Sequence, residues 1–211
     1  MYLNYSDCRK RFGSPYQIDK AIANGLLKKV ESGVYSDGGR VSELETIQFK
    51  YPKGIICFES AYFYHDLTDA IPDAYHLMTP SNAPAIKDPR IRQYYVPANI
   101  HSIGLTEISY CGDRVRTYDL ERLLIDTARM KSKLPSDMYK EVILAFRSRA
   151  KSLSEEKIGA YLQLFPKRNM AAIGLASGGG LYILALASTF LVLVGLEAFN
   201  FFLHKFDKRR K

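Results

Sequence analysis

Near the start of the chain, apolar residues recur at the spacing of an α-helix. Ile18, Ile22 and Leu26 are each four residues apart, which predicts a helix with one buried face. Ser14 can cap the N-terminus of this helix, and Gly25 follows its last turn. The segment therefore predicts a short amphipathic helix with a defined beginning and end.

A second short helix is predicted just before it, over residues 6–12, with Ser6 as N-cap and Gly13 as the stop. Two short helices joined at a glycine make a helix-turn-helix arrangement. The following stretch, NGLLKKVESGVYS (residues 24–36), alternates and turns like a β-hairpin, in which Gly33 supplies the positive φ. The order helix, helix, hairpin is that of a winged helix-turn-helix domain.

Beyond this region the pattern mixes strands with helices. Ser42 and Glu45 form a capping box that predicts a helix ending before Pro52. The apolar run GIICF (54–58) predicts a buried strand, and prolines and glycines divide residues 71–115 into short strands and loops. Amphipathic patterns then predict three further helices, within residues 119–133, 135–150 and 152–165.

The hydropathy pattern changes again near residue 169. No charged residue occurs between 169 and 196, and the apolar segment 181–203 is long enough to cross a bilayer as a helix. SGGG (177–180) precedes it as a flexible joint, and the basic cluster HKFDKRRK follows it, which suits anionic headgroups. The alternative interpretation is a buried C-terminal helix of a soluble domain.

We therefore expect an α+β fold in three parts. A winged helix-turn-helix domain covers residues 1–53, and a mixed α/β domain covers residues 54–169. Residues 170–211 contain the Gly-rich joint, the apolar helix, interpreted as transmembrane, and the basic tail.

Charge and cysteine usage narrow the class of partner and the compartment. The formal net charge of +8 and the pI near 9.3 favour an anionic partner, either nucleic acid or an acidic membrane face. Cys8, Cys57 and Cys111 are widely spaced and odd in number, which fits a reducing compartment. No apolar run follows the charges at the N-terminus, so no secretory signal is expected.

Nine residues of the first domain are predicted to bind DNA. Tyr16, Gln17 and Lys20 lie mostly off the apolar face of their helix, where they can reach base edges or phosphates in a major groove. Lys28 and Lys29 would lie against phosphates as part of the wing; the alternative is a solvated basic hairpin. The complete set is Lys10, Arg11, Ser14, Tyr16, Gln17, Lys20, Lys28, Lys29 and Tyr35.

The sequence has none of the common catalytic signatures: no phosphate-binding Gly loop, HExxH, CxxC or GxSxG. Its four histidines lack an i, i+4 partner, so each is interpreted as a packed or surface ring. We therefore expect no catalytic residue, no metal ligand and no cofactor. A weaker alternative is a metal-dependent nuclease that uses Asp113, Asp119 and Glu121.

Several blocks together resemble the AbiEi family, the antitoxins of bicistronic abortive-infection (type IV) toxin–antitoxin systems of bacteria. They are FGSPYQIDKAIANGLLKKVESGVYSD, VSELETIQFKYPKGIICFESAYFYHDLTDAIPDAYHLMTP and YDLERLLIDTARMKSKLPSDMYKEVILAFR. The most specific pieces are the GVY after the hairpin turn, the SAYFYHDLTD block and the ERLLID helix start. The likeness covers residues 1–168, whereas the segment from residue 170 onward departs from the family pattern.

The resemblance implies an autorepressor and antitoxin. In the family, a winged helix binds inverted repeats in the protein's own promoter, and the larger domain opposes a nucleotidyltransferase-like toxin without a stable complex. Carried over, residues 14–24 correspond to the recognition helix and residues 28–35 to the wing. We expect a cytoplasmic protein, tethered to the inner face of the membrane by its C-terminal helix. The alternative is a membrane-associated protein whose basic winged-helix domain contacts protein or lipid.

Overall fold

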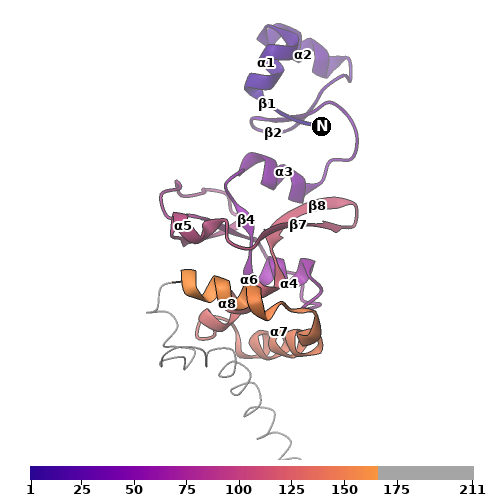
Figure 1. Cartoon of the computed structure of the whole chain (residues 1–211). Helices are drawn as coiled ribbons and strands as arrows, with labels where there is room; N and C mark the ends of the chain where they lie inside the picture. The colour runs from indigo at the N-terminus through magenta and orange to yellow at the C-terminus, as the bar shows by residue number, and fades with distance from the viewer. Residues whose placement is uncertain (166–211) are drawn as a thin grey trace, which may run out of the picture.

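A computed structural model describes residues 1–165 of the chain. Over these residues the protein is mixed α/β, with eight α-helices and two β-sheets (Figure 1). None of the helices within this range is long and apolar enough to span a bilayer. The predicted Gly-rich joint, apolar helix and basic tail of residues 170–211 lie outside the described residues.

The first 36 residues form a small unit at one end of the molecule (Figure 1). Its three-stranded antiparallel sheet has the order β1-β3-β2, and the central strand β3 pairs with both neighbours. The strand β1 is not predicted by the sequence pattern, because a run of three residues has too little alternation to be seen. The elements are β1 (Tyr2–Asn4), α1 (Tyr5–Phe12), α2 (Pro15–Ala23), β2 (Lys28–Glu31) and β3 (Val34–Ser36).

Local capping chemistry sets the helix ends of this unit. The Ser14 hydroxyl accepts a hydrogen bond from the Gln17 amide at 3.3 Å, which confirms the predicted cap of α2. Helix α1 begins earlier than predicted: Asn4, rather than Ser6, caps it through a reciprocal capping box with Asp7. Gly13 ends α1 with a φ of 88°, as expected.

The apolar face of α2 differs from the prediction at its C-terminal end. Ile18 is buried and Ile22 is half-buried, but the predicted Leu26 is 63% exposed. The helix ends at Ala23, so the chain leaves the helical path and Leu27 enters the core instead. The predicted hairpin is confirmed in β2 and β3, and Gly33 has a φ of 78°.

The larger unit contains a five-stranded mixed sheet of order β6-β5-β4-β8-β7. The pairs β5–β6 and β4–β8 are parallel, and the pairs β4–β5 and β7–β8 are antiparallel. The strands are β4 (Ile55–Ile56), β5 (Tyr75–Pro80), β6 (Ile91–Val96), β7 (Leu105–Tyr110) and β8 (Asp113–Tyr118). Strands predicted around residues 54–58 and within residues 71–115 are thereby confirmed.

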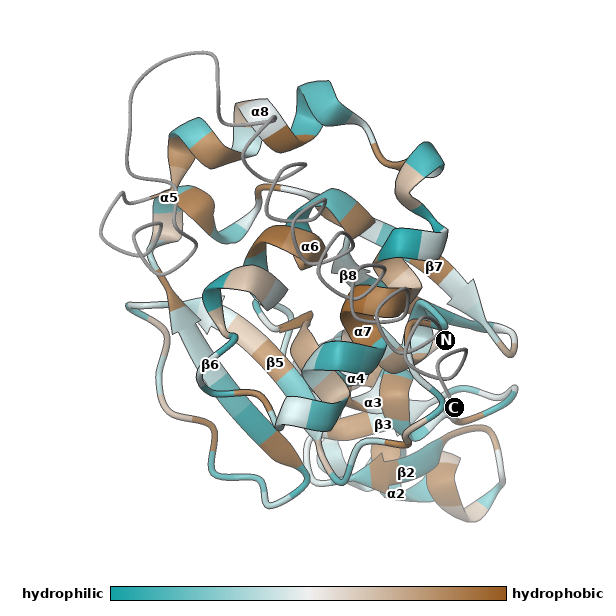
Figure 2. Ribbon diagram, turned by 90° about the horizontal axis from the view of Figure 1, so that it is seen from below, coloured by the Kyte–Doolittle hydropathy of each residue, from teal (hydrophilic) through white to brown (hydrophobic). Residues whose placement is uncertain are grey.

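Helices lie on both sides of this sheet. In Figures 1 and 2, α4, α6, α7 and α8 lie on one side, while α3 lies on the other side, between the two sheets. The amphipathic pattern predicted for α6 is visible in Figure 2 as alternating hydrophobic and hydrophilic stretches. The helices are α3 (Glu43–Lys50), α4 (Phe58–Tyr64), α5 (Ala98–His101), α6 (Leu120–Arg129), α7 (Ser136–Ser148) and α8 (Glu155–Leu164).

The buried apolar residues form two clusters. The smaller cluster lies between the first sheet and helices α1 and α2, and the larger one surrounds the five-stranded sheet. Leu44 and Ile47 place α3 in the larger cluster, so the small core is complete before α3 begins. The division of the chain after residue 53 stays a prediction.

A buried arginine organises the centre of the larger core. The Arg122 side chain is fully buried, donates to the Asp126 carboxylate at 2.9 Å, and donates to the carbonyl oxygens of Ile100 and Ile103 at 2.8 Å each. Its guanidinium also lies 4.5 Å from the Tyr118 ring centroid. These hydrogen bonds, the ion pair and the aromatic contact offset the cost of burying the charged guanidinium.

Candidate nucleic-acid interface

Helix α2 presents an open polar face to solvent. Ile18 and Ala21 point into the small core, whereas Tyr16, Gln17 and Lys20 are exposed, with the Tyr16 ring 71% accessible. The helical periodicity places Tyr16 and Lys20 one turn apart on the same side, with Gln17 beside them. These three side chains are therefore exposed, as predicted from their positions off the apolar face of the helix.

The net charge of the small unit favours binding of a polyanion. Residues 1–36 contain six lysines and arginines against three aspartates and glutamates, a net charge of +3. The exposed face of α2 also carries one acid, Asp19, beside Lys20. Asp19 and Lys20 balance each other on α2, so the excess positive charge of the small unit comes from α1 and β2.

The two lysines of β2 point to opposite faces of the small sheet. Lys29 pairs in register with Tyr35, whose ring lies in the core beneath the helices, so Lys29 lies on the helix side of the sheet. Lys28 pairs with Ser36, in register with Tyr2, which contacts α3 on the other side. Both lysines are exposed, but only Lys29 shares a face with α1 and α2.

The tip of the hairpin carries no positive charge. Its turn consists of Ser32 and Gly33, and the adjacent Glu31 is turned toward the larger unit. An irregularity in the pairing between Lys29 and Glu31 brings Glu31 to the same face as Lys28. The basic groups of the hairpin therefore lie at its base, next to the end of α2.

Tyr35 requires a correction. It is predicted to contact DNA from the wing, but the residue is only 8% exposed and packs in the small core with Leu3 and Cys8. Burial also raises the pKa of its phenol. Strand β3 is the central strand of the sheet, so alternate side chains point inward, and Tyr35 supports the fold rather than a ligand.

The remaining predicted residues lie near the helix junction. Lys10 and Arg11 are exposed in the last turn of α1, and Ser14 is half-buried as the cap of α2. Arg11 donates to the Asp37 carboxylate at 2.6 Å. The N-terminal ammonium and Arg11 together lower the pKa of Asp37 to about 2. Arg11 is thus partly neutralised, whereas Lys10 is exposed and forms no ion pair with the described residues.

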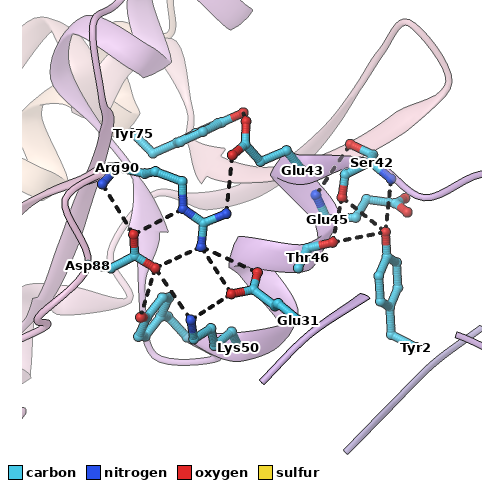
Figure 3. Close-up of polar contacts among 11 residues, drawn as sticks. Tyr2, Glu31, Ser42, Glu43, Glu45, Thr46, Lys50, Tyr75, Asp88 and Arg90 are labelled. Atoms are coloured by element: carbon cyan, nitrogen blue, oxygen red, sulfur yellow. Dashed lines mark hydrogen bonds and ion pairs between the residues drawn. The ribbon is translucent and has the colours of Figure 1, made fainter. Parts of the chain in front are cut away.

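A polar network joins the small unit to the larger one (Figure 3). Arg90 is its centre: it donates to Asp88 at 2.8 Å, to Glu43 at 3.1 Å and to Glu31 at 3.1 Å. Lys50 donates to Glu31 at 2.8 Å, and this bond lowers the pKa of Glu31. The network holds the hairpin against α3 and the five-stranded sheet.

A second contact lies on the same side of the small sheet. The Tyr2 hydroxyl donates to the Ser42 carbonyl at 3.0 Å and accepts from the Ser42 amide (Figure 3). The Tyr2 ring also stacks on the Phe49 ring, with 5.7 Å between the centroids. Sequence reasoning missed both contacts between the units. Residues such as Glu31 and Arg90 are 59 positions apart, and no local spacing indicates such a pair.

The acidic residues considered for a nuclease do not come together. Asp113 begins β8 and contacts Ser42 and Arg40, whereas Asp119 follows the other end of the strand and caps α6. A six-residue strand separates such ends by about 20 Å. Glu121 is buried and accepts a hydrogen bond from the Ser154 amide at 2.9 Å. These three carboxylates cannot share one metal ion.

Comparison with known proteins adds no relative. No protein-family model matches the chain, and no curated protein is significantly similar to it.

Proposed function

We propose that residues 1–36 are a winged helix-turn-helix unit that binds operator DNA in the protein's own promoter. The observation that carries the proposal is the exposed face of α2, with Tyr16, Gln17 and Lys20 outward on a unit of net charge +3. The element order α1, α2, β2, β3 supports α2 as the recognition helix. The hairpin then lies beside it as the wing.

Each group has a role that its chemistry suits. Gln17 can pair with the N6 and N7 edge of adenine, and Lys20 can donate to the O6 and N7 acceptors of guanine. Lys10 and Lys29 contact phosphates and contribute most of the salt dependence. Inverted repeats in the operator require two copies of the chain, with half-sites about one helical turn apart.

The test is an anisotropy titration of the full chain on its own upstream DNA and on a scrambled duplex of equal length. We expect tighter binding to the upstream DNA by a factor of about 10³ or more. The triple variant Tyr16→Ala, Gln17→Ala, Lys20→Ala removes this preference, whereas Lys133→Ala, exposed in the larger unit, leaves it unchanged. Equal affinity for both duplexes, or an unaffected triple variant, would refute the proposal.

We propose further that the chain is the antitoxin of a type IV abortive-infection system, as the AbiEi-like blocks indicate. The larger unit then opposes a nucleotidyltransferase-like toxin, encoded next to it, without forming a stable complex. Co-expression tests this: the full chain restores growth to cells that express the neighbouring toxin gene, and the two proteins elute separately in size-exclusion chromatography. Failure to restore growth contradicts the antitoxin role.

The membrane tether is proposed on the sequence alone. The charge-free segment and the basic cluster after it are typical of a helix anchored at an anionic surface. Cell fractionation tests it: the full chain is recovered in the membrane pellet, and a chain that ends at residue 168 is recovered in the supernatant. Recovery of both in the supernatant contradicts the tether.

A further inference from the structure

Three potential metal ligands converge near the start of strand β5, an inner strand of the five-stranded sheet. Glu59 lies in α4, Asp73 lies just before β5, and His76 lies in β5. One ligand atom of each lies within 4.8 Å of the other two. The three come from separate elements and share no sequence spacing, so only the fold brings them together.

His76 shows that the cluster is more than a group of surface acids. The imidazole is fully buried, and its Nε2 atom has no hydrogen-bond partner among the described residues. Such an unsatisfied buried nitrogen is costly and uncommon. The atom lies 3.7 Å from a Glu59 carboxylate oxygen, which is too long for a hydrogen bond. It is the separation expected between two ligands of one ion, since bonds of about 2.0–2.2 Å give ligand–ligand distances of about 3.4 Å in a tetrahedron.

The other side of the ring is held in place. The Tyr94 hydroxyl lies 3.3 Å from His76 Nδ1, and the two rings are 5.5 Å apart. With Nδ1–H donating to the tyrosine oxygen, the Nε2 lone pair is directed at the carboxylates. Metal-binding histidines are typically oriented by such a partner on the second nitrogen.

We propose that Glu59, Asp73 and His76 bind a divalent transition-metal ion, with Zn²⁺ as the preferred ion. One imidazole and two carboxylates suit Zn²⁺ or Mn²⁺, whereas Ca²⁺ and Mg²⁺ prefer oxygen ligands alone. Burial lowers the pKa of His76 to about 4, so the ring is neutral at neutral pH, as a ligand must be.

Arg92 provides a control variant that should raise the affinity for the metal ion rather than lower it. It lies opposite His76 in the parallel register and contacts Asp73 at 3.4 Å. Its side chain is 51% exposed, so the guanidinium can move into solvent when a metal ion binds the Asp73 carboxylate. Arg92 therefore competes with the ion for this carboxylate, and its removal strengthens binding.

The experiment titrates Zn²⁺ into the metal-stripped full chain in competition with a chelating dye. The background is Cys111→Ser, because Cys111 is the exposed one of the three cysteines and thiolates are ligands of Zn²⁺. We expect one ion per chain and a loss of affinity of about tenfold or more for Glu59→Gln and for Asp73→Asn. Asp69→Asn removes the charge of an exposed residue in the same loop and should leave the affinity for Zn²⁺ unchanged. Arg92→Gln should bind Zn²⁺ more tightly.

Spectroscopy separates the ligand role of His76 from a structural one. Co²⁺ replaces Zn²⁺ and gives visible d–d absorption bands that change when a nitrogen ligand is lost, so His76→Gln must alter the spectrum. Because His76 is buried, the fold of this variant is checked by far-UV circular dichroism, and Asp73→Asn serves as the second readout on an exposed residue. No ion bound at 1 mM Zn²⁺, or affinity unchanged in both carboxylate variants, overturns the proposal.

Discussion

Glu31, at the end of strand β2, forms an ion pair with Lys50 at the end of helix α3, with 2.8 Å between carboxylate oxygen and ammonium nitrogen. Arg90 approaches the same carboxylate at 3.1 Å. Two cations from the larger unit thus hold one anion of the hairpin. The orientation of the small unit on the rest of the protein depends on this carboxylate and on the Tyr2–Ser42 contact.

Replacing Glu31 with Gln should therefore destabilise the attachment of the hairpin. We expect a loss of about 1–2 kcal/mol in the free energy of unfolding, because a partly buried network loses its charge-assisted bonds. Urea denaturation measures the loss. Glu156→Gln, an exposed neutralisation in α8, is the control and should change stability by only a few tenths of a kcal/mol. Equal effects of the two variants would show that the network contributes nothing.

Gln17 should contribute specificity without general affinity. Gln17→Ala is expected to cost about 1–3 kcal/mol on the upstream DNA, and to relax the preference at one base pair only. Affinity for scrambled DNA should stay the same, because the glutamine carries no charge. Gel-shift titrations on a panel of single-base operator variants measure both quantities. Equal losses on every duplex would exclude direct base contact by Gln17.

The opposite orientations of Lys28 and Lys29 predict unequal roles. Lys29 lies on the sheet face that carries α1 and α2, so Lys29→Ala should weaken binding to all DNA and reduce the slope of log K against log salt by about one. Lys28→Ala is the matched control, with the same charge change one residue away, and should have the smaller effect. The reverse order of the two variants would place the DNA on the other face.

Acid should destabilise the protein through three histidines, of which His76 is buried and His65 and His101 are half-buried. Burial lowers the pKa of His65, His76 and His101, so the unfolded chain binds protons first as the pH falls below about 6.5. The free energy of unfolding therefore decreases between about pH 6.5 and pH 4.

His76 is the residue on which this acid effect can be measured. Its shift to about 4 corresponds to a contribution on the order of 3 kcal/mol. Nearby Arg92 adds to the shift, and the Asp73 carboxylate opposes it. Urea denaturation at pH 7 and pH 4.5, in the presence of a chelator, compares the wild type with His76→Gln. A pH dependence that is equally steep in the variant would contradict the assignment.

Removing Arg122 should disrupt the larger core. Arg122→Met leaves the buried Asp126 carboxylate and the carbonyls of Ile100 and Ile103 without their donor, so we expect a loss of about 3–5 kcal/mol. The double variant Arg122→Met, Asp126→Leu removes the unpaired charge as well and should recover part of this loss. Thermal and urea unfolding measure both. A single variant as stable as the wild type would show that the buried pair is dispensable.

The local features of the small unit could be predicted because local chemistry creates them. Ser14 caps α2, Gly13 ends α1, and Gly33 takes a positive φ in the hairpin, and each needs only its nearest neighbours. The prediction that Leu26 is buried is wrong, because its burial depends on the path of the chain after the helix rather than on its nearest neighbours. Helical spacing continues through it, but the helix ends at Ala23 and Leu27 takes the buried position, which is decided by how the chain turns toward β2.

By itself, the sequence determined the alternation of helices and strands, the caps of α2 and α3, the exposed polar face of α2 and the basic character of the chain. These depend on periodicity and on contacts within about four residues. Only the tertiary structure decided that Tyr35 is buried, that Lys28 and Lys29 point apart, that Glu31 reaches Arg90, and that His76 meets Glu59 and Asp73. Those relationships depend on strand pairing and on packing between distant segments, which no short sequence pattern encodes.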